Sequence, residues 1–214
     1  MNSLLVICFI ATLIYLSISV NIKSYINIIA FQGLLLFGVA ILELREIDVL
    51  HFSFILAETL IFKAIVIPYL MYRVSVKNKI INLKNSATHR ITKGFNMVII
   101  TTTVIAFTFL FSFDLHEDHL DVKYFSAALS SIILGLIFII INRNITLHLI
   151  SYLVIENGIF LLALAVGAEM PMMINWAILL DIFASVMVLG IFFNKLGEVH
   201  GGVLESDKLN ELKD

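Results

Sequence analysis

Long apolar runs, separated by short polar segments, dominate the chain. They predict seven membrane-spanning helices, at about 4–21, 26–43, 50–72, 95–113, 124–141, 146–166 and 171–193. Each run has roughly the 20 residues that a helix needs to cross the hydrocarbon core of a bilayer. A membrane β-barrel would show alternating segments of about ten residues instead. The pattern therefore predicts an all-α integral membrane protein.

The composition agrees with this reading. Of the 214 residues, 60% are hydrophobic and 14% are charged, whereas soluble domains carry roughly 25% charged residues. A soluble domain of this length could not bury so much apolar surface, so the expected surroundings are the lipid bilayer. No block of basic residues with interleaved aromatic residues indicates nucleic acid as a partner.

The charges of the loops predict an orientation. The segment 73–94 carries six basic residues and no acid, whereas the segment 114–123 carries four acids and one lysine. Because basic loops stay in the cytoplasm, the first is expected inside and the second outside. The other loops alternate in the same way, which predicts the N-terminus outside and the C-terminus in the cytoplasm. Lys23 follows the first run and no basic residue precedes it, so this run is interpreted as a retained helix and not a signal peptide.

The basic loop also divides the chain. We expect three membrane helices and a basic cytoplasmic loop at 1–94, two connecting transmembrane helices at 95–141, a helical hairpin at 142–195 and a cytoplasmic tail at 196–214. In the acidic loop, His116 and His119 match no specific metal-site spacing, so a solvated loop is expected there.

Two acids inside neighbouring spans are the first candidate functional groups. Glu156 lies in LISYLVIENGIFLLALAV and Asp181 in the next run, and the short turn between them predicts an antiparallel hairpin. Both carboxyls would then lie near the membrane centre, where acidic groups commonly serve in proton relays. Tyr152, one turn from Glu156, and His148, two turns away, predict a polar track from the cytoplasmic end; Asn157 adds a second polar group. The alternative is that one acid only hydrogen-bonds a neighbouring subunit and holds an assembly together.

Glu58 and Lys63, inside the predicted third span, are a second pair of ionisable groups. Five residues on a helix correspond to about 140° of rotation, so the two do not stack as a good ion pair. Lys63 is expected to find a carboxylate elsewhere, and the candidates are Glu43, Glu58, Asp181 and a residue of another subunit. Pro68 should kink this helix and free a carbonyl near its centre. Both a relay or tuning role and a static buried pair remain open for these charges.

The last third of the chain resembles a known family. The runs NRNITLHLISYLVIENGIFLLAL, DIFASVMVLGIFFNKLGEVHG and LNELKD are similar to component E of hydrogenase-4, a membrane subunit of group 4 nickel–iron hydrogenases and formate hydrogenlyase-type complexes. Lys63 and Pro68, followed by the basic loop, are similar to the family pattern more loosely. The fourth and fifth spans match it only in hydropathy.

The last three spans also resemble the small K-type subunit of respiratory complex I, in which two consecutive helices each carry a membrane glutamate. Glu156 takes the place of the first glutamate. Asp181 stands roughly where the second would be, and it is one methylene shorter. The resemblance implies that both acids belong to a hydrophilic axis through a membrane arm, with Lys63 and Glu58 as modulators or a second relay.

What the resemblance implies for function is a non-catalytic membrane-arm subunit of a complex I-like, proton-translocating hydrogenase. Iron–sulfur clusters and nickel–iron would lie on partner subunits, with no cofactor or metal site in this chain. The partners would be antiporter-like and complex I-like membrane subunits and a peripheral hydrogenase arm, in a bacterial or archaeal cytoplasmic membrane. The alternatives are a subunit of a multisubunit cation/proton antiporter or ion-driven uptake complex without a hydrogenase, and a scaffold that fills the arm. No CxxC, GxGxxG, P-loop or G-x-S-x-G motif gives the chain catalytic chemistry of its own.

Overall fold

The computed structural model describes residues 2–43, 56–77, 87–114, 121–142 and 145–166, together with the isolated position 190. Every element in this part of the chain is a helix. The elements are α1 (Asn2–Ile18), α2 (Ile22–Glu43), η1 (Leu56–Val66), α4 (Ile67–Lys77), α5 (Ala87–Asp114), α6 (Val122–Ile141) and α7 (Ile145–Val166).

Four of these helices contain segments long and apolar enough to cross a membrane, at Ile22–Leu42, Phe95–Phe113, Val122–Ile141 and Thr146–Ala165. They match four of the predicted spans closely, and the largest difference is the earlier start of α2. The α1 helix is apolar but shorter, and it ends before the predicted boundary at 21. The third predicted span is described from residue 56 onward, and the span 171–193, with Asp181, lies outside the described residues.

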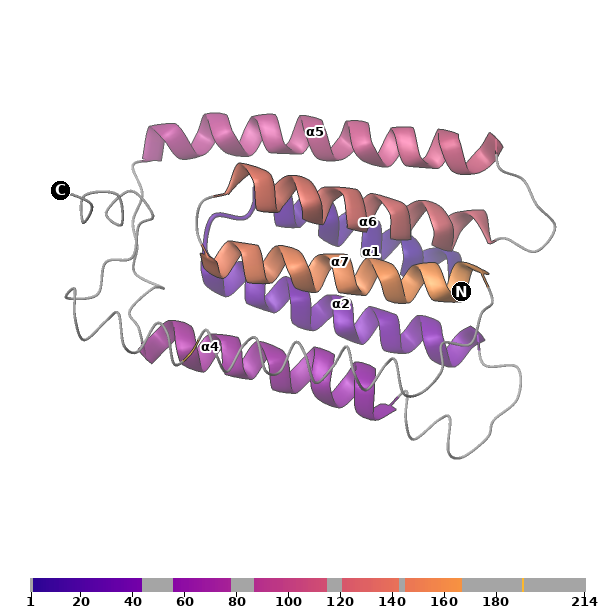
Figure 1. The fold of residues 1–214 in the computed structure, drawn as a ribbon, viewed down its shortest axis with the longest axis horizontal. Coiled ribbons are helices and arrows are strands. Elements are labelled where there is room, and N and C mark those ends of the chain that lie inside the picture. Colours follow the sequence, from indigo (N-terminus) through magenta and orange to yellow (C-terminus); the bar gives the residue numbers. More distant parts are fainter. Residues whose placement is uncertain are drawn as a thin grey trace.

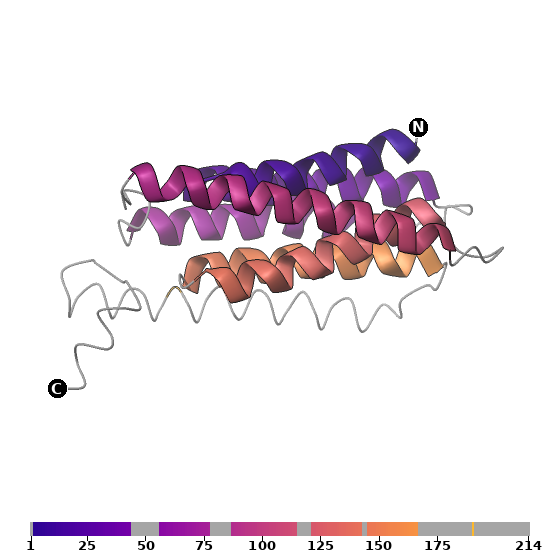
Figure 2. The ribbon, with the colours of Figure 1, turned by 90° about the horizontal axis from the view of Figure 1, so that it is seen from above.

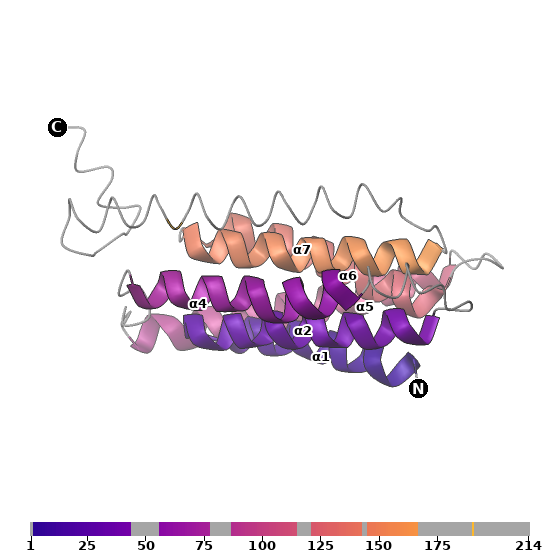
Figure 3. The ribbon, with the colours of Figure 1, turned by 90° about the horizontal axis from the view of Figure 1, so that it is seen from below.

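The helices pack side by side as an up-and-down bundle (Figure 1). In the views from above and below, each turned by 90° from Figure 1, α6 and α7 lie on one side of α1 and α2 (Figures 2 and 3). The α5 helix and the η1–α4 helix lie at opposite edges of Figure 1. This arrangement puts α2 between α1, α7 and the η1–α4 helix, and α2 contacts all of them.

Contacts at the helix ends fix which ends lie together. At one end, Lys123 Nζ donates a hydrogen bond to Ser3 Oγ over 2.9 Å, and the Asp121 N–H donates to the Ala165 carbonyl over 3.2 Å. At the other end, Lys23 Nζ lies 5.9 Å from the centre of the Tyr72 ring. The starts of α1 and α6 therefore meet the end of α7, while the start of α2 meets α4.

The α6 and α7 helices pack closely against each other through glycine residues. A Cβ built on Gly158 would lie 2.9 Å from Ser131 Cβ and 3.0 Å from the Ala128 carbonyl oxygen, and one on Gly135 would lie 2.9 Å from the Ser151 carbonyl oxygen. Small residues let helix backbones approach each other closely. In a membrane, where the hydrophobic effect does not drive helices together, such close packing favours their association.

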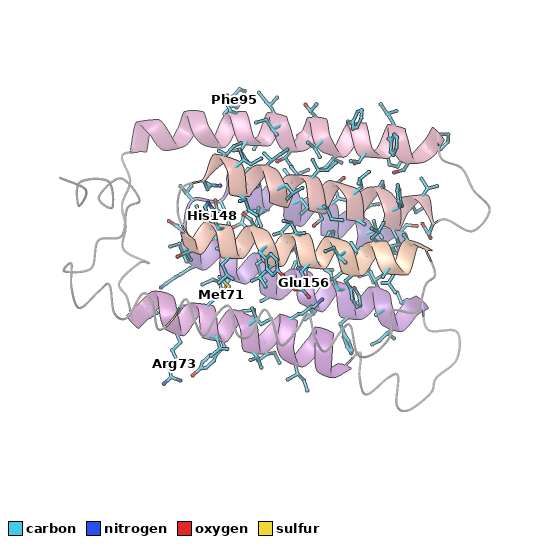
Figure 4. All side chains as sticks on the ribbon, in the orientation of Figure 1. Met71, Arg73, Phe95, His148 and Glu156 are labelled. Atoms are coloured by element: carbon cyan, nitrogen blue, oxygen red, sulfur yellow. The ribbon has the colours of Figure 1, made fainter. Side chains whose placement is uncertain are left out.

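The outer surface of the bundle is apolar. Leu110 is 69% exposed, Ile140 81% and Phe95 66%, and Figure 4 shows Phe95 pointing away from the bundle. Soluble monomers rarely expose large contiguous apolar patches. The described helices therefore have the surface of a multi-pass membrane protein.

The helix that carries Lys63 departs from α geometry. Residues Leu56–Val66 form a π-helix, and α geometry resumes at Ile67. Pro68 has no N–H, and in an α-helix its ring would clash with the carbonyl four residues earlier, at Ala64. Wider turns before the proline relieve that clash. The expected disturbance at Pro68 thus takes the form of a π-helix on its N-terminal side, and π turns are frequent at functional sites.

Candidate functional site

A buried ion pair between Lys63 and Glu156 lies at the centre of the site. Lys63 Nζ lies 2.6 Å from Glu156 Oε1, and the two side chains are 5% and 7% exposed. Figure 4 shows Glu156 near the middle of α7. At this distance the contact is a charge-assisted hydrogen bond, in which the ammonium donates and the carboxylate accepts. Two distant segments of the chain thus place opposite charges together in the core.

The surroundings of Lys63 explain how it reaches α7. A Cβ on Gly33 of α2 would lie 2.9 Å from both the Lys63 carbonyl carbon and the Ala64 nitrogen, so the missing side chain lets the two backbones touch. On the other side, Lys63 Nζ lies 4.7 Å from the centre of the Phe160 ring. Phe160 is one helical turn after Glu156. The ammonium is therefore held between a carboxylate and the face of an aromatic ring.

A chain of neutral hydrogen bonds runs beside the ion pair. Asn157 Nδ2 donates to Gln32 Oε1 over 3.1 Å, and Gln32 Nε2 donates to Thr12 Oγ1 over 2.9 Å. Thr12 Oγ1 in turn donates to the Phe9 carbonyl over 2.6 Å. Gln32 is completely buried and Asn157 is 2% exposed. These bonds join α7, α2 and α1 next to the charged residues.

The second carboxylate oxygen of Glu156 has a different environment. Glu156 Oε2 is buried and has no hydrogen-bond partner within the described part of the chain. Buried polar atoms are nearly always hydrogen-bonded, and an ionised oxygen without a donor is costly. The carboxylate therefore has one oxygen bound to an ammonium and one buried oxygen without a hydrogen-bond partner among the described residues.

The structure brings together two of the residues expected from the sequence, Glu156 and Lys63. Their pairing was not among the candidates named for Lys63, because no rule of helix spacing relates residues 63 and 156. Glu58 lies in η1, but its side chain is outside the described set, and so is all of Asp181. Their expected roles stay predictions.

The polar track that was expected to join His148, Tyr152 and Glu156 along α7 is not continuous in the structure. His148 Nε2 is hydrogen-bonded to the carbonyl oxygen of Asn142, at the end of α6. Tyr152 is 38% exposed, whereas Glu156 is buried. The three side chains therefore do not share one buried face of α7: His148 lies near the helix start, Tyr152 at the bundle surface and Glu156 in the core.

Sequence reasoning did not single out Gln32 or Thr12. A usable signal existed for Gln32, since it is an amide in the middle of the apolar run INIIAFQGLLLFGVAILE and is followed by Gly33. A polar side chain at that depth needs a partner. Thr12 gave no such signal, because a threonine can hydrogen-bond its own helix. Among the described residues, no group of three or more His, Cys, Asp and Glu side chains could hold a metal ion.

The fold and the site together define an all-helical protein with several helices of membrane-spanning length and a buried ion pair near their middle. The chain is similar to the uncharacterized protein Rv0085 of Mycobacterium tuberculosis (strain H37Rv), with 24% identity over 205 residues, which cover 91% of this chain and 87% of that protein. No protein-family model matches the chain, and no solved structure matches it.

Proposed function

We propose that this protein is a non-catalytic membrane-arm subunit of a complex I-like, proton-translocating hydrogenase of the hydrogenase-4 or formate hydrogenlyase type. The resemblance of the C-terminal third to component E supports the assembly. The observation that carries the proton-transfer role is the Lys63–Glu156 pair, buried between two helices with Glu156 Oε2 open. Ionisable groups inside a membrane commonly mark proton relays.

The proposal includes the membrane arrangement. Seven spans cross the bacterial or archaeal cytoplasmic membrane, with the N-terminus outside and the C-terminus in the cytoplasm. The grouping of helix ends supports it, because the basic start of α2 and the α4 end lie opposite the acidic N-cap of α6. In this arrangement Glu156 and Lys63 lie near the middle of the bilayer.

The geometry supports one elementary step. A proton that binds Glu156 Oε2 neutralises the carboxylate and weakens its attraction for the Lys63 ammonium. A neutral carboxyl no longer offsets the buried charge of Lys63 as the carboxylate does, which is unfavourable. The lysine charge therefore favours release of the proton, either back to its source or onward to the next acceptor. A pair with one open oxygen can alternate between these two states without large movement of the helices.

The direct test is Glu156→Gln, which keeps the shape of the side chain and removes its charge. We expect hydrogen turnover by the peripheral arm to continue while proton movement in membrane vesicles falls by at least about tenfold, since a relay group contributes on that scale. The matched control is Thr108→Val, which removes a buried polar contact between α5 and α6 and leaves Glu156 in place. Assembly is followed by the amount of purified complex. Normal assembly with unchanged proton movement in Glu156→Gln would overturn the relay role.

The nature of the assembly needs its own experiment. The native complex is isolated through a tag on this chain, and its other subunits are identified by mass spectrometry. A nickel–iron large subunit among them supports the hydrogenase assignment. A complex that contains only antiporter-like membrane proteins would replace it with the cation/proton antiporter alternative, in which the same ion pair would serve.

A further inference from the structure

The hydrogen bonds beside the ion pair have a fixed direction. The Phe9 carbonyl can only accept, so the Thr12 hydroxyl donates to it and offers its lone pairs to Gln32. Gln32 must therefore present Nε2 to Thr12 and Oε1 to α7. Asn157 must then present Nδ2 to α2. The oxygen and nitrogen ends of a side-chain amide have nearly the same shape. The Phe9 carbonyl at the end of the chain thus determines which end of each amide faces which partner.

This direction affects the orientation of α7. Asn157 and Glu156 are adjacent on the helix, so their side chains leave the axis about 100° apart. Fixing Asn157 toward α2 also fixes the sector in which Glu156 lies, which is the sector of η1. Gly33, the residue after Gln32, touches the η1 backbone at Lys63. Residues 32 and 33 of α2 therefore contact the helices on which both charges lie.

We infer that Gln32 is a positioning residue for the Lys63–Glu156 pair. Acting through Asn157, it holds α7 at the rotation that directs the Glu156 carboxylate to the Lys63 ammonium. The inference deepens the proposed function, since Gln32 influences proton transfer only if the ion pair takes part in it. The positioning itself is a property of the ion pair and can be tested without any measurement of transport.

A neutral chain suits this role better than a second charged pair. Amide and hydroxyl groups satisfied on both sides hold their geometry whether Glu156 is ionised or protonated, because none of them titrates near neutral pH. A basic residue at position 32 would instead compete with Lys63 for the carboxylate, and an acidic one would compete with Glu156 for the ammonium. The chain Phe9–Thr12–Gln32–Asn157 can thus keep the rotation of α7 constant through both states of the pair.

The test is a double-mutant cycle on folding, with the chain in mixed micelles and unfolding driven by added dodecyl sulfate. Gln32→Leu together with Asn157→Leu replaces both amides by apolar groups of similar size, which avoids leaving one unsatisfied. We expect this change to lower the folding equilibrium constant by about tenfold in the native background and by less than about threefold when Lys63→Met and Glu156→Gln are already present. Equal losses in the two backgrounds would overturn the inference and assign the amides to simple packing.

A matched control uses a polar contact that is remote from the charges. Ser17 and Thr101 share a buried hydrogen bond between α1 and α5, and Ser17→Ala with Thr101→Val should lower stability equally in both backgrounds. Thr12→Val serves as a milder second variant should the paired leucines prevent folding, and it must show the same dependence on the background. The infrared band of the Glu156 carboxyl, identified by its loss in Glu156→Gln, should shift in Thr12→Val and not in the control.

These outcomes separate the two proposals. Background-dependent stability with unchanged proton movement in Glu156→Gln would support the positioning role of Gln32 and refute the relay. Background-independent stability, with proton movement lost in Glu156→Gln, would refute the positioning role and leave the relay standing.

Discussion

Two interfaces of α7 place polar groups in the interior of the bundle in different ways. Toward α6, apart from His148 near the start of α7, the polar groups are small hydroxyls that mostly bond to backbone carbonyls, as when Ser131 Oγ donates to the Val154 carbonyl over 2.7 Å. Toward α2 and η1, the polar groups are long side chains that bond to one another across helices, and two of them are charged. In the first arrangement, the Ser131 hydroxyl has a backbone partner on α7. The second has an open oxygen on Glu156.

The two interfaces of α7 thus differ in kind, since one serves helix packing and the other holds charged groups. Along the middle of α7, hydroxyl–carbonyl bonds and glycine contacts bring α6 and α7 together without a charged group. The α2–η1–α7 junction combines the close backbone contact at Gly33 with a buried pair of opposite charges. Substitutions on the two sides of α7 should therefore have different consequences.

The largest effect is expected from breaking the ion pair on one side. Glu156→Leu leaves Lys63 charged and buried, and stability should fall by about 3–5 kcal/mol. The double variant Lys63→Met with Glu156→Leu removes both charges and should recover most of that loss. Unfolding in mixed micelles measures both. If the double variant were as unstable as the single one, the loss of stability would come from altered packing and not from the remaining charge of Lys63.

Gly33→Ala should have the next largest effect. The new Cβ would meet backbone atoms of Lys63 and Ala64 at 2.9 Å, and backbone cannot move aside as a side chain can. We expect a loss toward the upper end of about 1–3 kcal/mol, and part of it should disappear in the Lys63→Met background. Gly38→Ala on the same helix is the control, because its new Cβ would meet only the end of the Leu5 side chain at 3.2 Å.

Gly158→Ala should destabilise the opposite side of α7 without disturbing the charges. Its Cβ would meet Ser131, Ile132 and the Ala128 carbonyl at 2.9–3.0 Å, and we expect a loss toward the lower end of about 1–3 kcal/mol. The loss should be the same whether Lys63 is present or replaced by methionine. A loss that depended on Lys63 would show that the two interfaces of α7 are coupled.

The smallest effect is expected at the α5–α6 contact. Thr108 Oγ1 and Ser130 Oγ are 2.6 Å apart and buried, and interhelical hydrogen bonds in membrane proteins contribute about 0.6 kcal/mol on average. Thr108→Val should therefore reduce stability by about that amount and leave proton movement unchanged. A loss as large as that of Glu156→Leu would show that the hydroxyl contacts do more than support packing.

Much of the helical framework could be predicted from hydropathy alone. The apolar runs at 95–113, 124–141 and 146–166 correspond to α5, α6 and α7 because an apolar run of that length has one stable form in lipid. The N-terminal extension of α5 to Ala87 was missed, since the segment there is polar and basic. Hydropathy detects the part of a helix that contacts lipid and not the part that continues beyond it.

The candidate site could be predicted only in part. Glu156 and Lys63 stood out because charge is rare in apolar runs, but their pairing depends on α2 bringing η1 close to α7. Gln32 contributes through its partners, and Gly33 through the absence of a side chain. The π-helix before Pro68 could be anticipated as a disturbance, but its form depends on how the helix bonds rearrange around the missing N–H. Contacts between distant helices decide these features, and local sequence carries little information on them.

The linked side chains lie near the midpoints of their helices, since Thr12, Gln32 and Asn157 belong to α1, α2 and α7 at similar depth. The ion pair and the amide chain therefore extend across the bundle and not along it. In the proposed membrane orientation, a potential of 100 mV does about 2.3 kcal/mol of work on an elementary charge that crosses the whole bilayer. It does almost none on a charge that moves in the membrane plane. Proton exchange at Glu156 with a neighbour at the same depth should be insensitive to voltage, so any voltage dependence of transport must arise in the access routes to this layer.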